Sequence, residues 1–201
     1  MTYSFEQVVG FSAGLLEFSA FLLYYLSIFQ GKTRPNRATW FVLTVVGVLI
    51  VVSYYASGAR ETLWVPISYA VGPLIVFLLS IKYGEGGWAP FDRWSLLACL
   101  VSIILWKVLQ SSEISLFFSI LIDFFGLLPT LKKSYLDPQS EDKIAWSVTS
   151  LSNFLNIFAV SSWTFVIGFY PVYMFLVNGL VTAFLFLRKQ EKKVSIATLR
   201  N

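Results

Sequence analysis

Seven long apolar runs, separated by short polar segments, dominate the chain. They cover roughly residues 8–29, 40–57, 64–82, 94–110, 114–133, 144–162 and 163–187. Most approach the roughly 20 residues that an α-helix needs to cross the hydrocarbon core of a bilayer. Helices are expected because lipid offers no water to an unpaired backbone. The pattern predicts an all-α polytopic membrane protein with seven transmembrane helices.

Composition strengthens the membrane prediction and removes several functional classes. The chain is 57% hydrophobic and only 13% charged, whereas soluble domains carry about 25% charged residues. Histidine is absent, which removes the commonest metal ligand and any Ser/His/Asp triad. Cys99 is the only cysteine, so no intrachain disulfide is expected. We expect no metal and no cofactor.

The basic residues predict the orientation in the bilayer. Thirteen of the fifteen Lys and Arg residues fall in the predicted 1–2, 3–4 and 5–6 loops and in the C-terminal tail, and Arg60 and Lys107 are the two others. Such residues are retained on the cytoplasmic side. The N-terminus is therefore expected outside and the C-terminus in the cytoplasm, in a bacterial inner (plasma) membrane. The net charge of +4 mostly reflects this asymmetry, so no nucleic-acid partner is expected.

An internal repeat divides the predicted helices into two groups of three. A shift of 106 residues aligns Glu17 with Asp123 and Trp40 with Trp146 without a gap. An odd linker helix gives both repeats the same orientation, so an axis along the membrane normal relates them. We predict a 3+1+3 arrangement: a first repeat at 1–82, a linker with the fourth helix at 83–113, a second repeat at 114–188 and a cytoplasmic tail at 189–201.

The segment GLLPTLKKSYLDPQSED, residues 126–142, resembles the end of a PQ-loop helix with its basic loop. Pro129-Thr130 stands where that family has Pro-Gln, and Leu23-Tyr24 stands there in the first repeat. Together with the 3+1+3 pattern, the chain resembles the PQ-loop group, which includes the SWEET sugar transporters and the vitamin transporter PnuC. Asn178 resembles the substrate-side asparagine of SWEET proteins, whereas Gly72 stands at the matching position of the first repeat. The resemblance implies a midplane substrate site between the repeats.

Two acids lie about halfway along predicted helices. Insertion scales put the cost of a charged residue there at roughly 2.5–3.5 kcal/mol. Glu17 and Asp123 are therefore expected to face each other, face a polar cavity or stay protonated. They have either a functional role, binding a proton or a cationic substrate, or a structural one, joining helices by hydrogen bonds.

Polar and aromatic residues complete the candidate site. Asn153 and Asn156 are three residues apart and share a helix face, and Asn178 and Tyr69 lie at mid-depth. These amides either bind the substrate or form a hydrogen-bond ladder between helices. Trp40 and Trp146 begin the second and sixth runs, where tryptophan is typical of the interfacial belt. Their repeat equivalence makes a gate the alternative, with Pro129 as a third gating candidate.

The sequence favours a transporter of a small solute with its site between two three-helix bundles, and not an enzyme. Proton coupling and cation selectivity stay open at this stage, as does homo-oligomerisation. The alternatives are a membrane enzyme that uses the two acids on a lipid and a seven-helix receptor or sensor. The repeat argues against both, because neither activity needs two equivalent halves.

Overall fold

The computed structural model describes residues 3–84, 86, 90–109, 111–139 and 141–187. These residues form helices and connecting turns, with no strand among them, so the all-helical prediction is confirmed for this part of the chain. The predicted tail, 189–201, lies outside the described residues. In chain order the elements are α1 (Phe5–Phe29), α2 (Arg37–Ala56), η1 (Glu61–Leu63), α3 (Trp64–Tyr83), α4 (Pro90–Leu109), α5 (Ser112–Leu136), α6 (Lys143–Phe158) and α7 (Phe165–Leu187).

Five helical segments in the described part of the chain are long and apolar enough to cross a membrane. They are Phe5–Phe29, Arg37–Ala56, Glu61–Tyr83, Glu113–Leu136 and Phe165–Leu187. Many large apolar side chains on these helices point outward, including Leu26 and Leu78, each more than half exposed. Soluble proteins rarely present so much continuous apolar surface. The long apolar helices thus indicate an integral membrane protein.

The sixth helix is shorter than its apolar run predicts. The run extends to residue 162, but α6 ends at Phe158 after 16 residues, a length of about 24 Å. Ala159 caps the end through its N–H, which donates to the carbonyls of Asn156 and Ile157. Beyond it come Ser161 and Ser162, and serine side chains compete with the helical backbone for hydrogen bonds. At the other end Asp142 accepts from the N–H groups of Ile144 and Ala145.

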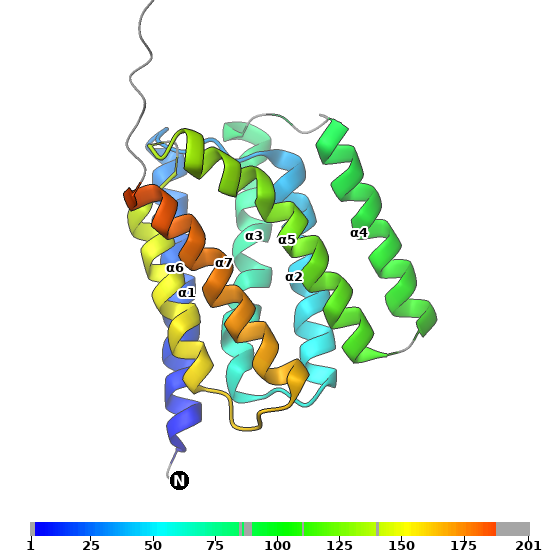
Figure 1. Ribbon diagram of the computed structural model, residues 1–201. Helices are drawn as coiled ribbons and strands as arrows, with labels where there is room; N and C mark the ends of the chain where they lie inside the picture. The colour runs from blue at the N-terminus through cyan, green and yellow to red at the C-terminus, as the bar shows by residue number, and fades with distance from the viewer. Residues whose placement is uncertain (1–2, 85, 87–89, 110, 140, 188–201) are drawn as a thin grey trace, which may run out of the picture.

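The helices pack in a pattern that treats the first three and the last three alike (Figure 1). Helix α3 packs against α1 and α2, and α7 packs against α5 and α6. Two further contacts join the groups: α1 with α6, and α2 with α5. Helix α4 lies at the outer edge, against α5 and α2. Exchanging the two groups of three helices leaves the six contacts named among them unchanged, whereas α4 packs mainly against α5 and α2.

Two glycines allow α1 to approach the start of α3 closely. A Cβ atom at Gly14 would overlap the Cβ of Trp64, and one at Gly10 would overlap the carbonyl of Glu61. Ser68 fixes the same contact by donating to the Gly14 carbonyl at 3.1 Å. Because packed interiors leave no room for an added methyl group, α1 and α3 form one closely packed unit.

Pro171 lies inside α7 without breaking it. Proline has no N–H, so the carbonyl four residues earlier loses its helical partner. That carbonyl belongs to Ile167, and the Tyr54 hydroxyl of α2 donates to it at 2.6 Å. The rings of Tyr54 and Tyr170 pack with centroids 5.0 Å apart. The Tyr54 hydroxyl, from the first group of helices, thus takes the place of the backbone donor that α7 lacks at Pro171.

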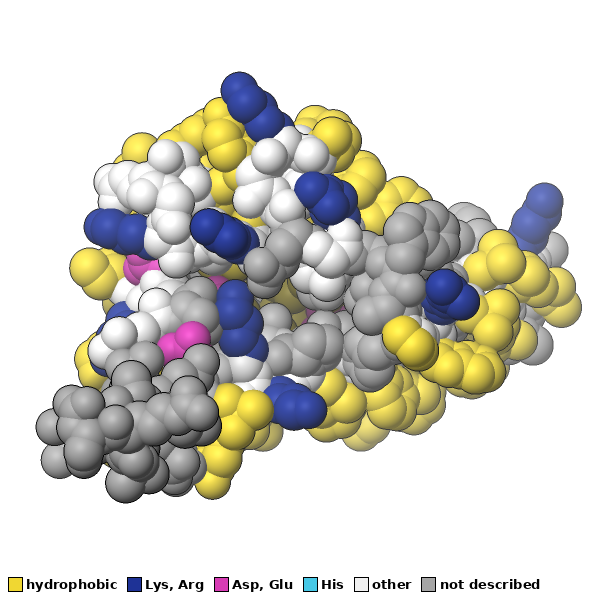
Figure 2. All heavy atoms as spheres, turned by 90° about the horizontal axis from the view of Figure 1, so that it is seen from above, with side chains coloured by type: hydrophobic (Ala, Val, Ile, Leu, Met, Phe, Trp, Pro, Cys, Tyr) yellow, Lys and Arg dark blue, Asp and Glu magenta, His cyan; other side chains and the backbone are white. Residues whose placement is uncertain are grey.

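Basic side chains of the described residues gather at the end of the bundle where α1, α3, α5 and α7 finish, here called the basic end. Figure 2 views this end from above and shows Lys and Arg spread over it. Arg37 holds the end together, donating to the carbonyls of Ser80, Gly84 and Gly86. The side chains that define the basic end are Lys32, Arg34, Arg37, Lys82, Lys132, Lys133 and Lys143.

Candidate functional site

A cavity lies between the two groups of helices, at the depth of Glu17. Its volume is about 40 Å³. Helices α1, α2 and α3 line one side and α5, α6 and α7 the other. The lining residues of this central cavity are Glu17, Ala20, Phe21, Tyr24, Trp40, Leu43, Tyr69, Leu127, Thr130, Ala145, Trp146, Thr149 and Asn178.

Five of the predicted site and gating residues line this cavity: Glu17, Tyr69, Asn178, Trp40 and Trp146. They come from five different helices. Residues separated by up to 161 positions thus meet at one place.

Glu17 is the acidic group of the cavity wall and is fully buried. Thr149 donates to its Oε1 at 3.3 Å, and the amide of Asn153 donates to its Oε2 at 3.5 Å. Both distances are at or beyond the long end of the usual range. Both donors are neutral and belong to α6. The Glu17 carboxyl group of α1 therefore lies in the contact between the first three helices and the last three.

Asp123 is equally buried but has a different environment. Tyr69 donates to its Oδ1 at 3.2 Å and Tyr173 to its Oδ2 at 2.8 Å. Asp123 is not among the residues that line the cavity; Tyr69 lies between them. The two acids occupy matching repeat positions with different partners, because the α2 positions that match Thr149 and Asn153 hold Leu43 and Gly47. Neither Leu43 nor Gly47 has a side-chain hydrogen-bond donor.

The three predicted asparagines separate into two locations. Asn178 lines the cavity and donates to the Met174 carbonyl at 2.7 Å. Asn153 donates to the Thr149 carbonyl at 2.9 Å as well as to Glu17. Asn156 lies further toward the end opposite the basic end and donates to the Thr62 carbonyl at 3.4 Å. Pro129 belongs to α5, and its side chain falls outside the described part of the structure.

A second hollow, here called the vestibule, leads from the basic end toward the cavity and has a volume of about 180 Å³. Arg34 and Lys133 are its basic lining residues. Tyr24, Trp40 and Thr130 line both the vestibule and the central cavity. The same three side chains therefore separate Glu17 from the basic end.

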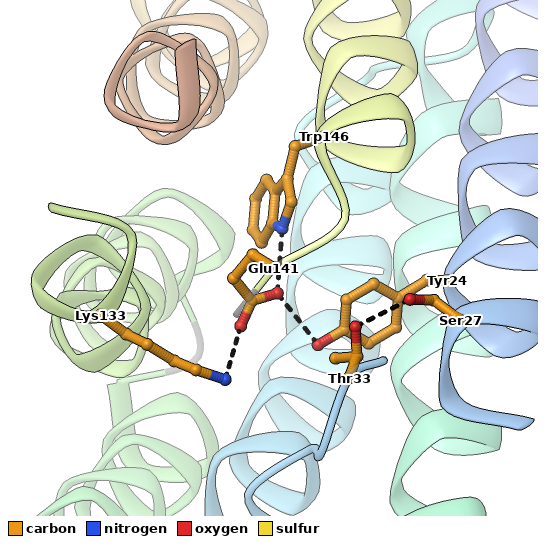
Figure 3. A network of polar contacts seen from close by, with 6 residues as sticks. All are labelled: Tyr24, Ser27, Thr33, Lys133, Glu141 and Trp146. Atoms are coloured by element: carbon orange, nitrogen blue, oxygen red, sulfur yellow. Dashed lines mark hydrogen bonds and ion pairs between the residues drawn. The ribbon is translucent and has the colours of Figure 1, made fainter. Parts of the chain in front are cut away.

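A polar network centred on Glu141 lies where the two hollows meet (Figure 3). Glu141 belongs to the turn before α6 and is 9% exposed. Its Oε2 accepts from the Tyr24 hydroxyl at 3.3 Å and from Trp146 Nε1 at 3.2 Å. Its Oε1 pairs with Lys133 Nζ at 3.1 Å. One carboxylate thus connects α1, α5 and α6.

Sequence reasoning missed Glu141, Tyr24 and Tyr173 as site residues. The available signal for Glu141 was an acid in a predicted basic loop, directly before the helix cap Asp142. Its inward direction depends on the tertiary fold. The tyrosines gave no signal, because one aromatic among many in an apolar run looks like packing.

Comparison of the chain with protein-family models, with curated proteins and with solved structures found no match.

Proposed function

We propose that the protein is a small-solute membrane transporter in which two three-helix bundles move against each other around the central cavity. The first bundle is α1–α3, the second is α5–α7, and α4 links them in a 3+1+3 arrangement. The observation that carries the proposal is the central cavity, whose wall combines Glu17 and Tyr69 of the first bundle with Asn178 of the second. Parallel-repeat transporters place their substrate at such an interface.

The packing pattern supports two equivalent bundles. The middle helix in space is α3 in one and α7 in the other, and the joining contacts, α1 with α6 and α2 with α5, exchange with each other under the repeat. In the proposed motion the contacts of α1 with α6 and of α2 with α5 open at one end of the molecule while they close at the other. Tyr24, Trp40 and the Glu141 network then form the gate at the basic end.

Buried polar atoms beyond Glu17 support a route through the opposite half. The side-chain atoms buried without a hydrogen-bond partner in the described part of the chain are Ser53 Oγ, Thr62 Oγ1, Ser134 Oγ, Asn153 Oδ1, Asn156 Oδ1 and Tyr170 OH. Ser134 lies near the basic end and Asn153 beside Glu17, whereas Ser53, Thr62, Asn156 and Tyr170 lie toward the opposite end. An unpaired buried polar atom costs about 1–3 kcal/mol, and hydration in an open state compensates that cost.

The distribution of charge supports the orientation. In the proposed orientation the basic end faces the cytoplasm and the N-terminus lies outside, which agrees with the retention of basic side chains on the cytoplasmic side. The positions of the acids disfavour the lipid enzyme. An acid and a base acting on one substrate must both reach it, and Asp123 does not line the cavity that holds Glu17.

A cysteine placed in the cavity tests the proposal without knowledge of the substrate. Ala20 lines the cavity and is 2% exposed. Ala20→Cys in a Cys99→Ala background is treated with a membrane-impermeant maleimide in intact bacteria and in inside-out vesicles. A transporter exposes this position to both sides, so modification is expected in both preparations. Lys32→Cys, at the basic end, should react only in the vesicles. Modification of Ala20→Cys from one side alone would refute the proposal.

A further inference from the structure

We propose that the central cavity binds a small organic cation of the alkylammonium class, with Glu17 as its counter-ion and the surrounding aromatic rings as its cage. This inference rests on the transporter proposed above and names its substrate class. It is argued from the charge of the wall, the rings of the wall and the small number of oxygen ligands.

The wall carries one acidic group and no basic one among its described residues. Glu17 is fully buried, and its partners, Thr149 and Asn153, are neutral and 3.3 and 3.5 Å away. A buried carboxylate without a cation is costly, so this carboxyl group holds either a proton or a positive ligand. Two basic side chains, Arg34 and Lys133, line the vestibule instead, and Lys133 is already paired with Glu141.

The rings of the wall suit a cation that also has apolar surface. The cavity is lined by five aromatic side chains: Phe21, Tyr24, Trp40, Tyr69 and Trp146. The face of an aromatic ring attracts a cation, most strongly for tryptophan, and aromatic cages of this kind recognise quaternary ammonium groups. Alkyl groups on the cation would fill the apolar remainder of the wall, formed by Ala20, Leu43, Leu127 and Ala145.

A divalent metal fits the same wall poorly. Calcium takes six to eight oxygen ligands, commonly from several carboxylates. The side chains of the described wall offer one carboxylate, the hydroxyls of Thr130 and Thr149 and the amide of Asn178; the hydroxyls of Tyr24 and Tyr69 already donate to Glu141 and Asp123. No group of three or more metal-binding side chains occurs in the described part of the chain.

The carboxyl group of Glu17 cannot hold a proton and an organic cation at once. Binding of the cation to the protonated form therefore releases one proton, and acidification releases the cation. The other titratable side chains of the described wall are Tyr24 of α1 and Tyr69 of α3, with Asp123 behind Tyr69. Tyr170 of α7 lies outside the wall but near Glu17, and the wall residues from α2, α5, α6 and α7 do not titrate. A site of this kind exchanges a cation for a proton across the membrane.

Binding to the purified full-length protein tests the inference with methylammonium, tetramethylammonium and choline as probes. Quenching of tryptophan fluorescence is an appropriate signal because Trp40 and Trp146 line the cavity. At least one probe should bind saturably at pH 8 and more weakly at pH 5.5. The neutral isostere of choline, 3,3-dimethylbutan-1-ol, replaces the charged nitrogen with carbon and should not compete at equal concentration.

Two variants assign the effect to Glu17. Glu17→Gln keeps the shape of the side chain and removes its charge, and it should weaken binding at least about tenfold and abolish the pH dependence. Glu113→Gln changes an exposed acid in the first turn of α5 and should bind like the parent. Circular dichroism and gel filtration establish that both variants fold.

Three results would overturn the inference: no probe binds, the isostere competes equally, or Glu17→Gln binds as the parent does. If Ala20→Cys is nevertheless modified from both sides of the membrane, the transporter proposal stands and only the substrate class is wrong. If that position reacts from one side only, the transporter proposal fails first.

Discussion

Removing one oxygen atom from Tyr24 tests whether the network in Figure 3 closes the cavity toward the basic end. Tyr24→Phe deletes the hydroxyl that donates to Glu141 over 3.3 Å. It keeps the ring that packs on Trp40 with centroids 5.2 Å apart. The other two partners of Glu141 belong to its own bundle. The substitution therefore removes the hydrogen bond of this network that joins the first bundle to the second.

The size of the effect follows from the type and length of the bond. A hydrogen bond to a charged group contributes about 1.5–3 kcal/mol. The O–O distance between Tyr24 and Glu141 exceeds the common value of about 2.7–2.8 Å, so the lower figure applies. A loss of about 1.5 kcal/mol shifts the ratio of open to closed gates about tenfold.

Cysteine modification measures this ratio. Thr130 lines both the vestibule and the cavity, so Thr130→Cys in a Cys99→Ala background reports on passage between them. Adding Tyr24→Phe should raise the rate of maleimide modification from the basic end about tenfold. Tyr55→Phe is the matched control, because Tyr55 lies at the end of α2 away from the basic end. Its ring there contacts the Arg60 guanidinium. An unchanged rate in Tyr24→Phe would refute the assignment of this network as a gate.

Three further substitutions probe packing and capping, each read from the thermal unfolding midpoint in detergent. Gly14→Ala should destabilise the fold by about 1–3 kcal/mol because its methyl group would overlap Trp64, whereas Gly179→Ala, with open space around the added atom, should be tolerated. Asp123→Asn should cost about 1–3 kcal/mol, since an amide offers one acceptor oxygen to two tyrosine hydroxyls, and equal stability would contradict these hydrogen bonds. Asp142→Ala should cost about 1 kcal/mol through loss of the α6 cap, and Asp142→Asn, which still caps, should cost less.

The helices were predictable because their cause is local. An apolar run of about 20 residues requires a helix in lipid wherever it lies in the fold, so the predicted start at residue 64 matches α3. The end of α6 was not predictable in this way. Hydropathy continues through Val160, whereas the helix ends where the Ala159 cap and the following serines supply other hydrogen bonds.

The candidate site was only partly predictable because it depends on partners far away in sequence. Polarity in an apolar run identified Glu17 and Asp123, but it did not indicate that only Glu17 lines the cavity. The difference arises from the second bundle, where Thr149 and Asn153 replace the Leu43 and Gly47 of the first. A repeat register predicts equivalent positions, and it cannot predict that two equivalent positions have acquired different neighbours.

The hydrogen bond from Tyr54 to the α7 backbone ties two distant positions together during sequence divergence. Replacing Tyr54 by phenylalanine while Pro171 is present would leave the Ile167 carbonyl without a partner. Replacing Pro171 by alanine would let the backbone of α7 donate to that carbonyl, whose second lone pair could still accept from the Tyr54 hydroxyl. Related chains that keep the proline at position 171 should therefore keep a hydroxyl donor at position 54, whereas chains without the proline have no such requirement.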